Sequence, residues 1–266
     1  PSLERDRRWR RLRAPCAAAR PPRATQAQPL ASSLCSWRHP GVVADSPIVA
    51  IKQFCRRRGI GDLNRILAKS PTFDAFMRGA VPAPQFPAAM LAECTESGLA
   101  EGAALGVEGW QGVLALLEQT GLRPLMLRCV RRLREAGLTV AALTNNYAPG
   151  PPSSEAERIR REEEHAAFAA RFDHFIESRV VGLSKPDPKI YSLALRQIGC
   201  QASEAIFLDD IKVNLKAPAQ MGVHTILVRN ETECSFHEAL RELEVVSGVK
   251  LLDGSTNVDE LPASRL

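Results

Sequence analysis

The sequence predicts an α/β fold in which helices cover both faces of a parallel sheet. From residue 122 onward, short apolar segments alternate with amphipathic helical patterns, and this alternation is typical of parallel strands joined by helices. The apolar segments, such as 205–208, are continuous runs, which indicates strands buried on both faces. Residues 47–117 show mainly helical patterns broken by glycines and prolines, so we expect a helical unit before the sheet region.

The first helix of the sheet region has a regular apolar face, formed by Met126, Cys129, Val130 and Leu133. Their i, i+3, i+4, i+7 spacing places them on one side of a helix. Gly137 is expected to end that helix, because glycine readily adopts the left-handed conformation found at helix ends. The mostly apolar segment 138–143 is then expected to form a strand that ends at Thr144.

The remaining elements continue the alternation. Residues 155–170 are predicted to form a charged helix exposed to solvent. The next helix, closed by Gly199, is expected to bury Ile190, Leu193, Ala194 and Ile198. Short strands are predicted at 175–178, 205–208 and 223–228, with a helix at 214–221. We therefore expect His224 to be a strand residue and not a metal ligand.

Length and composition bound the class of protein. With 266 residues, 45% of them hydrophobic, the chain can bury one sizeable core and a small accessory domain. No apolar run approaches the roughly 20 residues that span a bilayer. The formal net charge is +5, but nine Arg, one Asp and one Glu give residues 1–40 a charge of +7, which leaves −2 for the rest. The expected folded part thus lacks the positive charge that a nucleic-acid partner requires.

Residues 1–40 form an Arg-, Ala- and Pro-rich arm that we expect to be disordered. The alternative is a mitochondrial transit-type segment, which is also rich in Arg and poor in acids. Several prolines would break an amphipathic helix there: Pro15, Pro21, Pro22 and Pro29. We therefore expect a cytoplasmic location, with a mitochondrial one as the alternative. The seven cysteines show no Cys-x-x-Cys spacing, which favours small buried thiols in a reducing compartment.

Two adjacent carboxylates, Asp209 and Asp210, directly follow the predicted strand 205–208. The carboxyl ends of parallel strands are where open α/β sheets bind ligands. Paired acids in that place favour a hard cation such as Mg²⁺, which takes oxygen ligands. The alternative is an aspartate that caps a helix beside a solvated neighbour. Asn214 could cap the following helix or orient one of the carboxylates, and the cap is the safer expectation.

Two upstream segments carry groups that suit a phosphate. Thr144 follows an apolar strand, so its hydroxyl and backbone N–H are expected to project into the same crevice, although a strand-ending threonine is often only a turn residue. Lys185 precedes Pro186-Asp187-Pro188, and the fixed φ angles of the prolines hold this loop in one shape. A lysine held in this way can neutralise a phosphate. A lone loop lysine would instead face solvent.

Three segments resemble motifs II, III and IV of the haloacid dehalogenase (HAD) superfamily: 141–146, 182–188 and 207–214. The resemblance is greatest to the subgroup that includes the N-terminal phosphatase domain of soluble epoxide hydrolase and the related domain of acyl-CoA dehydrogenase family member 10. It implies a HAD-like Rossmannoid sheet with an inserted helical cap. The core would comprise residues 41–46 and 118–254, the cap residues 47–117, and a polar tail residues 255–266.

The resemblance also implies a reaction, the Mg²⁺-dependent hydrolysis of a phosphate monoester. In that chemistry an aspartate attacks phosphorus and the aspartyl-phosphate is then hydrolysed. Asp210 would be the metal ligand with Asp209 as its support and second candidate ligand, and Thr144 and Asn145 would donate to the phosphate. Lys185 would be the charge clamp, and together with Asp209 it is a candidate catalytic residue. The substrate would be a small molecule, with lipid phosphates and sugar phosphates both open.

The first motif departs from the family pattern. Gly41-Val42-Val43 matches its end, but counting back places Arg38 where the nucleophilic aspartate belongs and Pro40 where the acid/base residue belongs. Asp45 is the nearest acid and lies on the wrong side of the glycine. Residues 31–37 do not have the pattern of a buried strand. The motif I strand is expected in the middle of the sheet, and if residues 30–37 cannot replace it, the two neighbouring strands would keep unpaired N–H and C=O groups.

Three interpretations of function remain open. The first is a HAD-like phosphatase domain whose motif I is degraded or missing. The second is a non-catalytic HAD-like module that binds a phosphate ligand or a protein. The third is an incorrectly assembled sequence of an active enzyme, from which the true first strand and its aspartate are absent. The intact motifs II to IV favour this third interpretation over the second. Four apolar residues of the expected cap could either line a substrate pocket or pack the cap helices against one another: Phe73, Phe76, Met77 and Phe86. Packing is the favoured interpretation.

Overall fold

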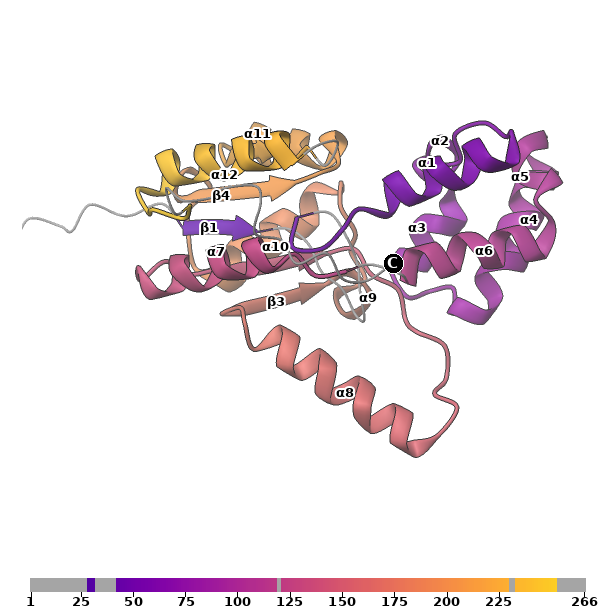
Figure 1. The fold of residues 1–266 in the computed structure, drawn as a ribbon, viewed down its shortest axis with the longest axis horizontal. Coiled ribbons are helices and arrows are strands. Elements are labelled where there is room, and N and C mark those ends of the chain that lie inside the picture. Colours follow the sequence, from indigo (N-terminus) through magenta and orange to yellow (C-terminus); the bar gives the residue numbers. More distant parts are fainter. Residues whose placement is uncertain (1–27, 32–41, 119–120, 230–232, 253–266) are drawn as a thin grey trace, which may run out of the picture.

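The computed structural model of the chain describes residues 28–31, 42–118, 121–229 and 233–252. Figure 1 shows two parts, a sheet with its covering helices and a separate group of helices beyond one end of that sheet. Within the described ranges, no helix is long and apolar enough to cross a membrane.

A five-stranded parallel sheet in the order β3-β2-β1-β4-β5 forms the centre of the larger part. Its strands are β1 (Gln28–Ala31), β2 (Ala141–Thr144), β3 (His174–Glu177), β4 (Ala205–Asp209) and β5 (His224–Leu227). The strands labelled in Figure 1 point toward the separate group of helices. The carboxyl ends of the strands, where a ligand site is expected, therefore face that group.

Helices cover both faces of the sheet, as the sequence predicts. One face is covered by α7 (Pro124–Glu135) and α12 (Glu233–Ser247), which pack with Ala142, Ile206 and Leu208. The other face is covered by α10 (Pro188–Ile198) and α11 (Lys216–Gln220), which pack with Leu143, Ile176 and Phe207. Successive strand residues point to opposite faces, so continuous apolar runs are required. The expected apolar face of α7 is confirmed, since all four of its predicted residues are buried.

β1 corrects two expectations from the sequence. It lies at the centre of the sheet and pairs with both β2 and β4, so the central position is filled. Residues 28–31 are therefore not disordered, while the rest of 1–40 lies outside the described residues. The physical reason is main-chain pairing, because a central strand satisfies N–H and C=O groups on both of its neighbours. That gain does not require the apolar run on which the sequence analysis relied.

The second part consists of helices that lie between β1 and β2 in the sequence. They are α1 (Pro47–Arg58), α2 (Asn64–Leu67), α3 (Pro71–Met77), α4 (Phe86–Glu96), α5 (Ala100–Ala104) and α6 (Gly106–Glu118), with a 3₁₀ turn at Ala83–Gln85. This helical unit has a core of its own. Phe76 and Phe86 are 0% exposed and their ring centroids lie 4.2 Å apart. Packing among the helices thus accounts for these aromatic residues, and the pocket hypothesis is wrong for both.

The remaining elements agree with the predictions to different degrees. α8 (Glu155–Ala169) has no buried residue, as expected of an exposed helix, and Figure 1 shows it standing away from the sheet. The short α9 (Ser178–Val181) follows β3, and 3₁₀ turns lie at Ala202–Glu204 and Lys212–Leu215. The predicted helix 214–221 is thus split between the second of these turns and α11. His224 lies in β5 and faces Glu242, so the expected strand position is confirmed.

Candidate active site

The carboxyl ends of β2 and β4 bring the predicted site residues together. Thr144 is the last residue of β2, Asp209 is the last residue of β4, and Lys185 lies on the loop between α9 and α10. All three residues are buried, with whole-residue exposed fractions of 2% for Thr144 and Asp209 and 8% for Lys185. Residues that are distant in the sequence are in direct contact here. Asn145 and Lys185, for example, are 40 residues apart.

Asp209 is the most heavily bonded residue of the site. Its Oδ2 accepts a hydrogen bond from Lys185 Nζ at 2.9 Å, and its Oδ1 accepts the backbone N–H of Ile211 at 2.8 Å. Asn214 Nδ2 lies 3.1 Å from both oxygens. A buried ion pair requires such additional hydrogen bonds, because removing the charges from water is costly. Asn214 therefore orients a carboxylate, and the expectation that it caps the next helix is wrong.

Lys185 is fixed by contacts with the carboxyl ends of β2 and β4. Besides Asp209, its Nζ donates to the carbonyl oxygen of Leu143 at 3.1 Å. The side-chain amide of Asn145 holds the lysine main chain, since Nδ2 donates to Lys185 O and Oδ1 accepts the Lys185 N–H, both at 2.8 Å. The lysine does not face solvent. The side-chain amide of Asn145 thus positions Lys185, while donation from Asn145 to a phosphate stays a prediction.

Asp210 is half-buried beside Asp209, and its Oδ2 accepts a hydrogen bond from the hydroxyl of Ser46 at 2.7 Å. Burial, followed by the negative charge of Asp209, raises the pKa of Asp210 to about 7. The Ser46 hydrogen bond and the charge of Lys185 act in the opposite direction. Lys185 thus bonds to Asp209 and its charge also acts on the neighbouring carboxylate of Asp210.

The carboxylate oxygens of Asp210 and Asp209 suit a magnesium ion that is held by few protein ligands. Within the described ranges, no three His, Cys, Asp or Glu side chains form a group that could hold a metal. Mg²⁺ is nevertheless commonly bound through one or two carboxylates and keeps several waters. Adjacent carboxylates repel each other, and a cation bound between them would relieve that repulsion. Because donors already contact both oxygens of Asp209, Asp210 is the better placed of the two as a direct ligand.

The expected nucleophile position is not described. Arg38 and Pro40 both lie outside the described residues. β1 ends at Ala31, which pairs with Leu208, one residue before Asp209, and the next two residues in the sequence are serines without a carboxylate. The nearest acid, Asp45, contacts Arg123 at 3.3 Å and its side chain is 67% exposed. Asp45 thus belongs to the surface and not to the buried site.

A buried polar cluster at the end of β3 supports the loop after β2, and the sequence analysis assigns it no role. The backbone N–H of Asn146 donates to Ser178 Oγ at 2.8 Å, and the Asn146 side-chain amide donates to Glu177. Glu177 also accepts hydrogen bonds from Arg179 and contacts His165. Asn146 and Glu177 are 31 residues apart in the sequence and come into contact only when the sheet forms. No local sequence pattern indicates such a contact.

The chain belongs to the haloacid dehalogenase-like hydrolase family, whose sequence profile matches residues 75–222. It is 32% identical over 194 residues to bifunctional epoxide hydrolase 2 of Rattus norvegicus, covering 72% of this chain and 33% of that protein. It is 37% identical over 152 residues to acyl-CoA dehydrogenase family member 10 of Mus musculus, covering 57% of this chain and 13% of that protein. The predicted resemblance is thereby confirmed.

A fungal relative is also similar. The sesquiterpene phosphatase astK of Aspergillus oryzae is 32% identical over 125 residues, which is 46% of this chain and 60% of that protein. The chain spans less than two thirds of each of these three relatives. Among solved structures, a predicted HAD-like family hydrolase from Porphyromonas gingivalis has a TM-score of 0.51 at 17% identity, covering 82% of this chain and 98% of that one. This likeness shows the fold.

Proposed function

We propose that the chain is a Mg²⁺-dependent phosphate monoester hydrolase domain whose motif I is degraded. The observation that carries this proposal is the convergence of Lys185, Asp209 and Asp210 at the carboxyl ends of β2 and β4. A buried ammonium group beside two carboxylates can hold an anion and a cation at the same place. The similarity to a sesquiterpene phosphatase supports phosphate ester chemistry.

Each site residue has a proposed role that follows from its contacts. Asp210 holds the cation, and Asp209 fixes Lys185 and supports the neighbouring carboxylate. Lys185 neutralises the phosphate, while Asn145 fixes the main chain of that lysine. Thr144, at the end of β2, is proposed to donate to a phosphate oxygen. A bound Mg²⁺ supplies electrostatic stabilisation of charge on the phosphoryl oxygens.

The helical unit Pro47–Glu118 is proposed to act as the cap of this site. The labelled strands in Figure 1 point toward this unit, and contacts such as the 2.6 Å hydrogen bond from Ser184 Oγ to Asp74 Oδ1 join it to the site loops. A unit in this position can exclude water and select substrates. The substrate is proposed to be a small phosphate monoester, either a lipid phosphate or a sugar phosphate.

The second candidate is a non-catalytic HAD-like module that binds a phosphate ligand or a protein. One observation favours it, namely that Asp45, the nearest acid to the expected motif I, is exposed and paired with Arg123. A module of this kind would keep its affinity for phosphate but would not release alcohol from a phosphate ester. Because the first candidate also lacks the motif I nucleophile, the double change Arg38→Asp with Pro40→Gly separates the two candidates. Turnover gained in that variant favours the hydrolase domain, and phosphate binding without turnover favours the non-catalytic module.

Calorimetric titrations of the whole chain with MgCl₂, and then with inorganic phosphate in the presence of Mg²⁺, test the proposed site. We expect a Kd for Mg²⁺ of roughly millimolar, because the site offers few protein ligands. Asp210→Asn should abolish the Mg²⁺ signal, and Lys185→Met should weaken phosphate binding. The double change Arg38→Asp and Pro40→Gly should tighten Mg²⁺ binding, since it removes a guanidinium that cannot be deprotonated. Unchanged Mg²⁺ affinity in Asp210→Asn would refute the proposed metal site.

A further inference from the structure

Ser46 lies at the junction between the core and the helical unit, and its hydroxyl does not make the capping hydrogen bond that is usual at this position. It occupies the N-cap position of α1, yet its side chain makes no capping hydrogen bond. N-cap serines usually accept a hydrogen bond from the first turn of their helix. Here the hydroxyl donates to Asp210 Oδ2 at 2.7 Å across 164 residues of sequence, and Ser46 is only 8% exposed.

The main chain before Ser46 is fixed to the core. Val43 and Ala44 are 0% exposed and belong to the core of the sheet. The carbonyl oxygen of Val43 accepts the Arg123 N–H at 2.8 Å, and the Asp45 N–H donates to Gly121 O at 3.0 Å. The segments that lead into and out of the helical unit are therefore bonded to each other immediately before Ser46. Movement of α1 must then turn about this junction and displace the Ser46 hydroxyl.

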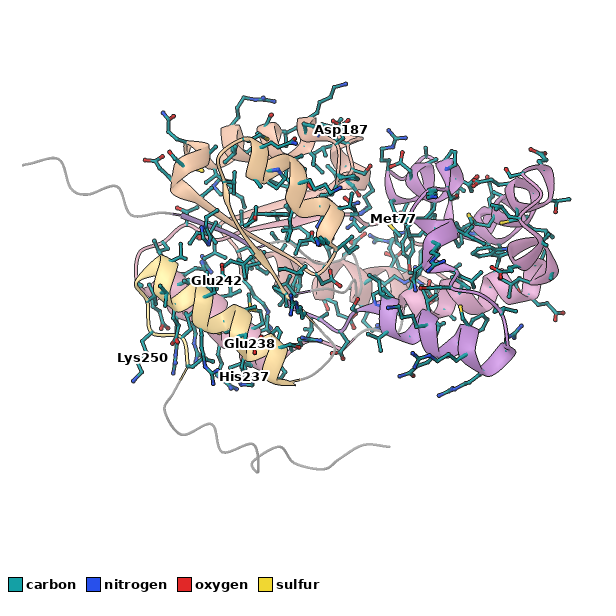
Figure 2. The ribbon with its side chains drawn as sticks, turned by 90° about the horizontal axis from the view of Figure 1, so that it is seen from above. Met77, Asp187, His237, Glu238, Glu242 and Lys250 are labelled. Carbon is teal, nitrogen blue, oxygen red and sulfur yellow. The ribbon has the colours of Figure 1, made fainter. Side chains whose placement is uncertain are left out.

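Other contacts join the helical unit to the loops that carry the remaining site residues. Ser184, next to Lys185, donates to Asp74 of α3 at 2.6 Å. Ser178 is hydrogen-bonded to the carbonyl oxygen of Met77, which lies at the border of the two parts in Figure 2. Tyr147 stacks on Phe76 with ring centroids 4.3 Å apart. These contacts go to Asp74, Met77 and Phe76, whereas Ser46 touches the proposed metal ligand itself.

We propose that Ser46 is a positioning residue that holds the carboxylate of Asp210 and couples the cation affinity of that carboxylate to the seating of the helical unit. The inference rests on the proposed function. A hydrogen bond to an ionised carboxylate is charge-assisted and restricts its rotation. Because α1 starts at the next residue, the carboxylate orientation and the position of α1 are linked, and the linkage is reciprocal. Mg²⁺ should therefore favour the seated helical unit.

The test is a calorimetric Mg²⁺ titration of the whole chain and of Ser46→Ala, Ser46→Thr and Ser153→Ala, with amide hydrogen exchange of residues 45–51 measured with and without Mg²⁺. Ser46→Ala should weaken Mg²⁺ affinity roughly tenfold, the effect of losing one charge-assisted hydrogen bond. Ser46→Thr keeps the hydroxyl and should lie within about twofold of the unchanged chain. Ser153→Ala, a matched loss of a hydroxyl bonded to a carboxylate (that of Glu157 on the exposed helix α8), should leave Mg²⁺ affinity unchanged.

Hydrogen exchange supplies a readout that a purely structural role would not move. Mg²⁺ should slow exchange at residues 45–51 in the unchanged chain and in Ser153→Ala, but not in Ser46→Ala. Equal Mg²⁺ affinity in Ser46→Ala and the unchanged chain overturns the inference, provided that Asp210→Asn has lost the signal. If Asp210→Asn binds Mg²⁺ as well as the unchanged chain does, the proposed metal site fails and the coupling fails with it.

Discussion

The buried pair of Lys185 and Asp209 gives a direct prediction for stability. The two side chains are 6% and 3% exposed, and Nζ lies 2.9 Å from Oδ2. Replacing Lys185 by methionine keeps an unbranched apolar stem of similar length, so little space is left unfilled. The change removes the ammonium group and leaves Asp209 as a buried carboxylate beside Asp210.

The expected loss follows from the contacts that survive. Breaking a buried ion pair by removing one partner costs about 3–5 kcal/mol. Asp209 still accepts hydrogen bonds from Ile211 and Asn214 in the variant, and these continue to compensate part of its charge. We therefore expect Lys185→Met to lower the free energy of unfolding by about 3 kcal/mol, at the lower end of that range.

Urea unfolding at neutral pH without Mg²⁺ measures this loss as a shift of the midpoint at constant slope. Lys189→Met is the matched control, because Lys189 is exposed on α10, and it should change stability by no more than about 0.5 kcal/mol. The double variant Lys185→Met with Asp209→Asn should lose less than the sum of the single changes, since it leaves no unpaired buried charge. A loss below about 1 kcal/mol in Lys185→Met, or strict additivity, would refute the reasoning.

Two further predictions concern the loop after β2. Burial raises the pKa of Glu177, but the His165 hydrogen bond, the Arg179 charge and the Asn146 hydrogen bond together hold that pKa below its usual value. The carboxylate of Glu177 therefore contributes stability that is fully present above its unfolded pKa and is lost as pH falls through its folded pKa. The free energy by which the unchanged chain exceeds Glu177→Gln in stability should shrink from about pH 6 to about pH 3. A constant difference would contradict this. Tyr147→Ala should cost about 3 kcal/mol in urea unfolding, because a buried aromatic ring is lost; its ring is 4% exposed and stacks on Phe76. An equal loss in Tyr147→Phe would show that the hydroxyl, and not the ring, carries the effect.

The sheet and its covering helices could be predicted because their signal is local. The apolar face of α7 and the run Ala205–Leu208 are visible in the sequence, and both are buried. α12 carries the same kind of signal, since Phe236, Ala239, Leu240 and Leu243 recur at helical spacing and are buried, yet the sequence analysis assigns no helix there. The spacing of these four residues therefore indicates α12 from the sequence alone.

β1 and the roles of several site residues could not be predicted, for a different reason. β1 is held by main-chain pairing with two strands more than 100 residues away, and its local pattern does not indicate this. The contact of Ser46 with Asp210, and that of Asn145 with Lys185, likewise depend on where distant loops meet. Residue type suggested a phosphate donor at Asn145, and only the fold shows that its side-chain amide also holds the main chain of Lys185.

The rate of p-nitrophenyl phosphate hydrolysis in millimolar Mg²⁺ tests the central claim most directly, namely that the chain keeps a phosphate and metal site but lacks the nucleophile of motif I. Loss of a covalent nucleophile removes several powers of ten in rate. We predict that the chain shows no turnover above that of its Asp210→Asn variant. Robust Mg²⁺-dependent turnover that survives Asp45→Asn and is abolished by Asp210→Asn would contradict the claim.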